Sequence, residues 1–270
     1  MSTNKHILAA IDFNESSEMM LEYLSQYADK NDKITLLHVL NQGYMGVNLS
    51  GGILPFDAEA KRLKEMTGQY FEGFDDVENQ IGFDPNDAGD GIVRYADSND
   101  VDTIFIASRD KHTLMDKILG STCLRVVNSA PCDVVVIPHG TKYRPMEKLI
   151  LAADKGVSDL LTAERFESWK GCQVFFVHII EDDQDDFDDE KKQLMVKLFD
   201  QNDVDFSFGV ETLKSQDTVK AILSFAHNEN ADAVLLRKSN QSLISTLFLS
   251  STTKEIIDKT ILPLIFITTK

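Results

Sequence analysis

The sequence predicts an α/β protein in which two similar halves each form a parallel sheet covered by helices. Short apolar segments alternate with segments whose apolar residues recur at helical spacing, as in β-α-β units. Near-continuous apolar segments, such as 134–137, are typical of strands buried on both faces of a parallel sheet. The same order of segments repeats after about 130 to 140 residues, which indicates an internal duplication.

The elements of the first half follow from local patterns. The first apolar segment ends at Asp12, and Asn14 then supplies a side chain suited to start a helix, with Met20 and Leu24 on its apolar face. The last strand of this half ends at Pro138. The expected strands are 6–11, 33–40, 77–83, 103–107 and 133–137, and helices are expected from residue 14 and over 57–71, 90–99 and 121–128.

The second half repeats this order after a polar linker, 139–145, bounded by glycine and proline. Asp154 and His178 recur as the counterparts of Asp12 and His38. The linker therefore predicts two domains, 1–140 and 146–270. In the second domain the expected strands are 149–153, 173–180, 205–209 with 210–213, 233–236 and 264–268, and the expected helices are 158–169, 188–200, 218–228 and 251–260.

The composition argues against several kinds of function. A net charge of −17, shared by both halves, makes nucleic acid and anionic membranes poor general partners. The three cysteines, Cys123, Cys132 and Cys172, lack the spacing of a disulfide framework or a zinc site and fit a reducing compartment. No signal peptide and no bilayer-length apolar segment is visible. We therefore expect a cytoplasmic protein without a metal site.

The candidate binding site follows the strand 103–107. The next helix opens on Gly120, Ser121 and Thr122, where first-turn N–H groups and hydroxyls suit a phosphate, and an ordinary helix cap is the other interpretation. Ligands of parallel sheets bind outside the carboxyl ends of strands where the strand order reverses. Asp12 and the loop after Ala107 lie at such ends.

The order and spacing of these features, found once in each half, resemble the universal stress protein family in its tandem two-domain form. The segments that carry the resemblance in the first half are Ala9-Ala10-Ile11-Asp12, Leu36-Leu37-His38-Val39, Ile104-Phe105-Ile106-Ala107-Ser108-Arg109, Gly120-Ser121-Thr122 and Ala130-Pro131-Cys132-Asp133. Those of the second half are Leu151-Ala152-Ala153-Asp154, Val177-His178-Ile179, Ser250-Ser251-Thr252 and Pro263-Leu264-Ile265.

The resemblance implies a five-stranded parallel sheet in each half, with strand order 3-2-1-4-5, and pairing of the halves as a pseudo-dimer. It also implies at most one adenine-nucleotide site, in the first half, which would take ATP, together with Mg²⁺ if ATP is bound, or another adenine nucleotide. Many members of the family bind ATP through a Gly-x2-Gly-x9-Gly-Ser/Thr motif, with an Asp after the first strand near the adenosine. Carried over to this sequence, the binding residues are Asp12, Val39, Ala107, Arg109, Gly120, Ser121 and Thr122.

This sequence departs from the family's motif. In the first half its three glycine positions fall on Ala107, Asp110 and Gly120, and Asp110 brings a negative charge toward the phosphates. In the second half they fall on Arg237, Asn240 and Ser250, so that half is expected to be a structural partner. Arg237 and Lys238, with Lys254, are either solvated or supply positive charge to another anion.

Other polar features are expected to be structural. His38 and His178 are expected to be partly buried with satisfied hydrogen bonds, because no nucleophile lies beside either in a recognisable motif. The acidic segment 181–190 lacks the glycine and spacing of an EF-hand, which favours a solvated loop. The glycine-rich segment 42–55 either closes over a ligand or is simply flexible.

Three kinds of function are compatible with the fold class that the sequence predicts. We expect a non-catalytic stress-response protein with at most one degenerate adenine-nucleotide site, in the first half. The alternative is an interaction protein that binds a protein partner, a second copy of itself or another small ligand. An ATP-hydrolysing enzyme is disfavoured, because the sequence shows no recognisable base, metal pair or arginine finger.

Overall fold

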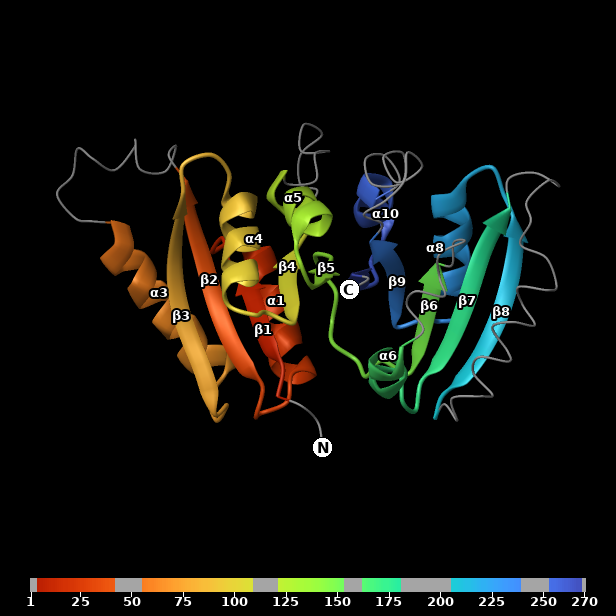
Figure 1. The fold of residues 1–270 in the computed structure, drawn as a ribbon, viewed down its shortest axis with the longest axis horizontal. Helices are drawn as coiled ribbons and strands as arrows, with labels where there is room; N and C mark the ends of the chain where they lie inside the picture. The colour runs from red at the N-terminus through yellow and green to blue at the C-terminus, as the bar shows by residue number, and fades with distance from the viewer. Residues whose placement is uncertain are drawn as a thin grey trace. The chain divides into compact units, whose positions relative to one another are not determined.

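The computed structural model describes residues 4–41, 55–108, 121–152, 162–180, 205–238 and 253–268. The chain divides into two compact units, an N-terminal unit, Met1–Tyr143, and a C-terminal unit, Arg144–Lys270 (Figure 1).

The N-terminal unit is built on a parallel sheet with the strand order β3-β2-β1-β4-β5. This order confirms the predicted 3-2-1-4-5 arrangement, in which the order reverses between β1 and β4. The central strands are almost fully buried, as their apolar sequences require. The five strands are β1 (His6–Ala10), β2 (Lys33–Asn41), β3 (Asp76–Asp84), β4 (Thr103–Ala107) and β5 (Asp133–Ile137).

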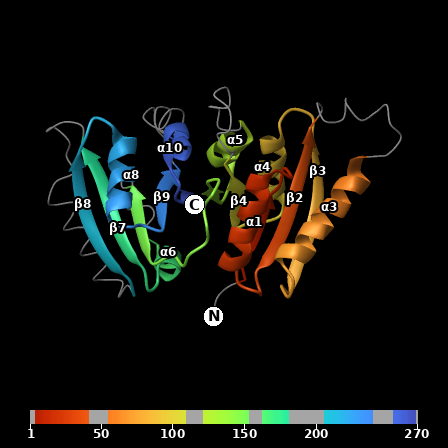
Figure 2. The same ribbon diagram turned by 180° about the vertical axis from the view of Figure 1, so that it is seen from behind.

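Helices cover both faces of this sheet. Figure 2 shows α1 (Glu15–Tyr27) and α3 (Pro55–Tyr70) on one face, and Figure 1 shows α4 (Ala88–Ser98) and α5 (Ser121–Ser129) on the other. Asn14 caps α1 as predicted, because its side chain accepts the backbone N–H of Ser17 at 2.8 Å. The helix predicted at 90–99 begins earlier, at Ala88, because the Asp87 carboxylate accepts the N–H of Gly89 at 2.7 Å.

The C-terminal unit repeats the sheet as β10-β9-β6-β7-β8, again with parallel pairing. Its third strand is continuous, whereas the sequence predicted two pieces, 205–209 and 210–213. The strands are β6 (Lys148–Ala152), β7 (Gln173–Ile180), β8 (Ser207–Lys214), β9 (Ala233–Lys238) and β10 (Leu264–Thr268).

Three helices of the C-terminal unit are described: α6 (Ala163–Ser168), α8 (Thr218–Asn228) and α10 (Thr253–Lys259). Asp217 caps α8 by accepting the N–H of Lys220 at 2.9 Å. At the end of α6, Trp169 packs with Phe166, Phe176 and Phe206 in an apolar core. The helix predicted at 188–200 lies outside the described residues.

Among the residues that the structure describes, no helix is both long enough and apolar enough to cross a membrane.

Candidate functional site

The carboxyl ends of β1, β2 and β4 meet at one edge of the N-terminal sheet. Ala10, the last residue of β1, pairs with Leu37 of β2 and with Ile106 of β4. Extended two residues past β1, the same alignment directs Asp12 toward Val39 and toward Ser108, which follows β4. The strand arrowheads in Figure 1 point to the edge at which α5 begins. The register therefore brings together segments of the chain that the sequence separates widely.

Asp12 is exposed, and its carboxylate is tied to the start of α1. The hydroxyl of Ser17 donates to Oδ1 of Asp12 at 2.5 Å, and the side-chain amide of Asn14 donates to Oδ2 at 2.8 Å. These bonds fix the orientation of the carboxylate, and each oxygen keeps a lone pair for another donor. Asp12 therefore combines a structural role with the capacity to accept a ligand hydroxyl.

The turn after Asp12 contains an aromatic cluster that the sequence analysis missed. Phe13 has a φ of 59°, which is uncommon for a residue with a bulky side chain. The His38 ring packs against it with centroids 4.5 Å apart, and the Arg62 guanidinium lies 4.2 Å from its centroid. His38 is buried as predicted, and its Nδ1 donates to the carbonyl oxygen of Ile11 at 2.7 Å. The cluster holds β1, β2 and α3 together beside Asp12.

Val39 occupies a notch between two glycines. Its ladder partner on β3 is Gly82, where an added Cβ would lie 3.3 Å from Cγ2 of Val39. On α4, a Cβ at Gly91 would lie only 2.6 Å from Cγ1 of Val39. The end of β2 therefore contacts the first turn of α4 at a distance that only glycine permits.

The start of α5 supplies the hydroxyls expected on the phosphate side. Ser121 is exposed and Thr122 half-buried, while Val126 and Val127 anchor the helix in the core. The first turn of α5 carries no acidic residue, which leaves its N–H groups suited to an anion. Three residues named in the sequence analysis lie outside the described residues: Arg109, Asp110 and Gly120.

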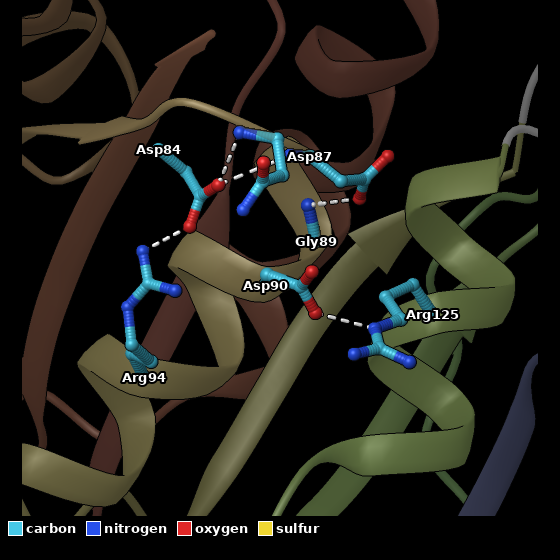
Figure 3. A network of polar contacts seen from close by, with 7 residues as sticks. Asp84, Asp87, Gly89, Asp90, Arg94 and Arg125 are labelled. Carbon is cyan, nitrogen blue, oxygen red and sulfur yellow. Dashed lines mark hydrogen bonds and ion pairs between the residues drawn. The ribbon is translucent and has the colours of Figure 1, made fainter.

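An ion pair between a buried carboxylate and a largely exposed guanidinium anchors the entry to α4 (Figure 3). The Asp84 side chain has no exposed surface, and its carboxylate pairs with the Arg94 guanidinium. It also accepts the backbone N–H groups of Asn86 at 2.7 Å and Asp87 at 3.0 Å. Burial by itself raises the pKa of Asp84, but the two N–H groups and Arg94 outweigh burial and lower that pKa.

A second ion pair joins α4 to α5. The Nε of Arg125 donates to Oδ1 of Asp90, as Figure 3 shows, and both side chains are partly exposed. Beside this pair, a Cβ on Gly89 would lie 2.8 Å from Cβ of Arg125. Glycine is therefore needed where the two helices approach most closely.

The same edge holds a serine–histidine contact that the sequence analysis did not identify. The Ser16 hydroxyl lies 3.1 Å from Nδ1 of His139, which follows the carboxyl end of β5. Ser16 is buried. The contact connects the start of α1 to the end of the sheet, and nothing in the local sequence of either residue indicates it.

The C-terminal unit carries cationic residues at the corresponding strand end. Arg237 and Lys238, the last residues of β9, occupy the register positions of Ala107 and Ser108, and Lys238 is buried. The candidate phosphate side of this unit therefore differs from that of the N-terminal unit. Its other predicted counterparts lie outside the described residues: Asp154, Asn240, Ser250, Ser251 and Thr252.

Within the described ranges, no three His, Cys, Asp or Glu side chains gather as a metal site. The arrangement in the N-terminal unit suits recognition: a carboxylate after β1, the backbone near the end of β2, and a helix N-terminus with hydroxyls. The parallel pairing and the reversal of strand order place the N-terminal unit in the class of doubly wound α/β folds.

The comparison with known proteins names the family within that class. The sequence model of the universal stress protein family matches residues 3–138, and the chain belongs to this family. The match covers the N-terminal unit almost completely.

Individual relatives agree with this assignment. The chain is 27% identical over 154 residues to the universal stress protein MJ0577 of Methanocaldococcus jannaschii, an alignment that spans 49% of this chain and 94% of the relative. A universal stress protein from Archaeoglobus fulgidus superposes with a TM-score of 0.74 at 19% identity, covering 98% of this chain and 96% of the other. A similar protein from Pseudomonas aeruginosa has a TM-score of 0.60 at 14% identity, covering 98% and 94%. Both structures share the fold along nearly the whole chain.

Proposed function

We propose that this chain is a non-catalytic, cytoplasmic stress-response protein that binds one adenine nucleotide, ATP, in its first domain. The proposed domains are 1–140 and 146–270, with the second as a structural partner. The observation that carries the proposal is the convergence of Asp12, Val39 and the start of α5 at one sheet edge. Association with a second copy of the chain and with a protein partner belongs to the same proposal.

The residues of this edge fit the parts of a nucleotide. An exposed carboxylate such as Asp12 accepts ribose hydroxyls, and the backbone at Val39 lies beside it to meet the base. The N–H groups and hydroxyls at Ser121 and Thr122 meet phosphate oxygens. Arg109 and Gly120 complete the proposed set on the basis of the family resemblance. Mg²⁺, where ATP brings it, would be held by the phosphates, because the described residues contain no cluster of metal ligands.

The test is titration calorimetry of the purified chain with ATP and Mg²⁺, after mass spectrometry of any small molecule released on denaturation. We expect one binding event per chain. Asp12→Asn removes a negative charge, and this change alone would strengthen binding of the anionic ATP. If Asp12 contacts the ribose, the loss of the charged acceptor instead weakens ATP binding, which is the result we expect. The matched control is Asp75→Asn, an exposed carboxylate before β3, at the other end of the sheet.

The departure from the family's motif gives a second test. Replacing Asp110→Gly removes a negative charge and restores the glycine of the motif, so it should tighten ATP binding. A chain that releases no nucleotide, shows no heat with ATP and is not rescued by this change would contradict the proposal. That outcome would favour the interaction protein, and the search would turn to its partner.

A further inference from the structure

The first turn of α4 lies between the two sides of the proposed nucleotide site. On one side, Gly91 contacts Val39 at the end of β2, where an added Cβ would lie 2.6 Å from Cγ1. On the other side, Gly89 contacts Arg125 of α5, where an added Cβ would lie 2.8 Å from Cβ. Two glycines in one helical turn weaken a helix, so close packing accounts for them better than helix propensity does.

Side chains at the end of β3 and on α4 itself fix the position of this turn. Asp84 at the end of β3 accepts the N–H groups of Asn86 and Asp87 and pairs with Arg94, one turn further along α4. Asp87 in turn caps the helix at Gly89. The first turn of α4 is therefore fixed to the sheet by contacts that do not involve α5.

Asp90 converts this fixed turn into a restraint on α5. Its carboxylate accepts Nε of Arg125, which lies one turn after Ser121 (Figure 3). We propose that Asp90, through Arg125, is a positioning residue that holds the start of α5 at the distance from Val39 that a bound nucleotide requires. This inference rests on the proposed function. Asp90 itself contacts α5, and its effect on phosphate is indirect.

The C-terminal unit lacks this arrangement. The residues that correspond by strand register and helix position to Val39, Gly82 and Gly91 are Ile179, Leu213 and Ala221. Val219 replaces Gly89, and the charges are exchanged, with Lys220 at the position of Asp90 and Glu255 at that of Arg125. Glu255 pairs with Lys259 of its own helix. The restraint thus occurs in the unit for which nucleotide binding is proposed.

The decisive variant is Asp90→Asn, tested by calorimetry with ATP and with adenosine. Removing a negative charge near the phosphates would by itself strengthen ATP binding. Loss of the restraint should weaken ATP binding. Because the Asp90–Arg125 pair is partly exposed, its energy corresponds to a decrease in ATP affinity of about two- to fivefold. Adenosine affinity should not change, because the Val39 side of the site is held by Gly91. Equal or tighter ATP binding in Asp90→Asn would overturn the inference.

Two further variants separate positioning from direct contact. The exchange Asp90→Lys with Arg125→Glu rebuilds the pair with reversed charges, so ATP affinity should return close to that of the unmodified chain. If Arg125 itself bound phosphate, the exchange would instead weaken ATP binding further. The matched charge control is Glu65→Gln, which breaks the exposed Lys61–Glu65 pair on α3 and should leave both affinities unchanged.

Amide hydrogen exchange of the ligand-free chain separates this inference from the proposed function. We expect faster exchange over 121–126 in Asp90→Asn and restored protection in the charge exchange. If the unmodified chain binds no ATP, but exchange over 121–126 still differs between that chain and Asp90→Asn, the proposed function fails and the helix restraint stands. If ATP binds and exchange over α5 is the same in every variant, the nucleotide site stands and the restraint is contradicted.

Discussion

The two units of this chain share a strand order and a register, yet they differ where the helix after the third strand meets the last helix. In the N-terminal unit, Gly89 and Gly91 allow α4 to approach α5 and β2 at less than ordinary Cβ contact distances. In the C-terminal unit, α8 has Val219 and Ala221 at these positions, and Val219 is buried. The same strand order occurs with both arrangements, so the sheet itself does not require the close approach.

The comparison also separates two ways of fixing a helix to a strand end. Asp84 anchors α4 as a buried charge with an arginine partner, whereas Ser215 occupies this place before α8 and accepts the N–H of Asp217 at 3.1 Å. A neutral hydroxyl is sufficient for the turn. The buried charge adds rigidity and a dependence on pH that the C-terminal unit does not have at this position.

The chain's single tryptophan allows the two units to be followed separately. Trp169 is buried in the core of the C-terminal unit, so its fluorescence reports unfolding there, while far-ultraviolet circular dichroism reports both units. Changes confined to the N-terminal unit should alter the circular dichroism transition and leave the tryptophan fluorescence transition unchanged.

The largest effect is expected from the side chains that anchor α4 and α8 to the preceding strands. Asp84→Asn replaces a buried carboxylate that accepts two backbone N–H groups and the Arg94 guanidinium, and should lower the free energy of unfolding of the N-terminal unit by about 2 to 3 kcal/mol. The corresponding change Ser215→Ala removes one neutral acceptor and should lower that of the C-terminal unit by about 1 kcal/mol or less. Urea unfolding with both signals measures the two values, and equal losses would remove the distinction between the anchors.

The same pair has a pH signature. Because the pKa of Asp84 is lowered in the folded chain, its stabilising contribution is fully present above the ordinary Asp value of about 3.9. The contribution is lost as the pH falls through the lower, folded-state pKa. The stability difference between the unmodified chain and Asp84→Asn should therefore be constant near neutral pH and shrink below about pH 4. A difference that grows on acidification would contradict the assigned direction.

A smaller effect is expected where α4 meets α5. Gly89→Ala places a Cβ 2.8 Å from Cβ of Arg125 and should destabilise the N-terminal unit by about 1 to 2 kcal/mol. The control is Gly68→Ala on α3, where an added Cβ has no atom within 4 Å. There alanine should stabilise by about 0.5 to 1 kcal/mol through helix propensity. Stabilisation at both positions would show that α4 can move away from α5 freely.

The exchanged charges predict a still smaller, salt-dependent coupling. Asp90→Lys and Arg125→Glu should each destabilise the N-terminal unit, and the double variant should recover about 0.5 to 1 kcal/mol. The coupling should weaken as ionic strength rises, because both side chains are partly exposed. Additive single effects would show that Asp90 and Arg125 do not act as a pair.

At neutral pH the smallest effect concerns the end of α1, because this effect develops only at alkaline pH. Burial, with Asp32 and Asp133 nearby, raises the pKa of Tyr27 from the ordinary 10 to about 12. Since the unfolded chain releases this proton first, stability should fall as the pH rises from about 10 to about 12. Tyr27→Phe should reduce that fall in the circular dichroism signal. The corresponding helix of the C-terminal unit ends at Trp169, which does not titrate, so its fluorescence transition should be the same in both proteins.

The sequence predicted the elements well because their causes are local. Alternating apolar and polar segments marked the strands, and Asn14 and Asp217 began helices with their own side chains. The family resemblance supplied the strand order, which the pairing of β1 with β2 and β4 confirms. Among the residues that the structure describes, the differences lie at element ends and in the third strand of the C-terminal unit, where one strand replaces two predicted pieces.

The candidate site was predicted only in part. Asp12 follows β1 and Val39 lies near the end of β2, so both are at the edge that the carboxyl ends of the parallel strands share, while their role in binding stays a prediction. The Phe13–His38–Arg62 cluster and the Ser16–His139 contact join residues that lie far apart in the sequence, and no local pattern marks them.

The sequence by itself determined the α/β class, the repeated order of elements and the polar residue Asp12 that follows the first strand, since these depend on hydrophobic period and chain order. Only the tertiary structure decided why α4 carries two glycines, which arginine pairs with which aspartate, and how α5 is held near Val39. These depend on distances between elements, and such distances are set by side-chain volumes packed across the sheet and not by neighbours along the chain.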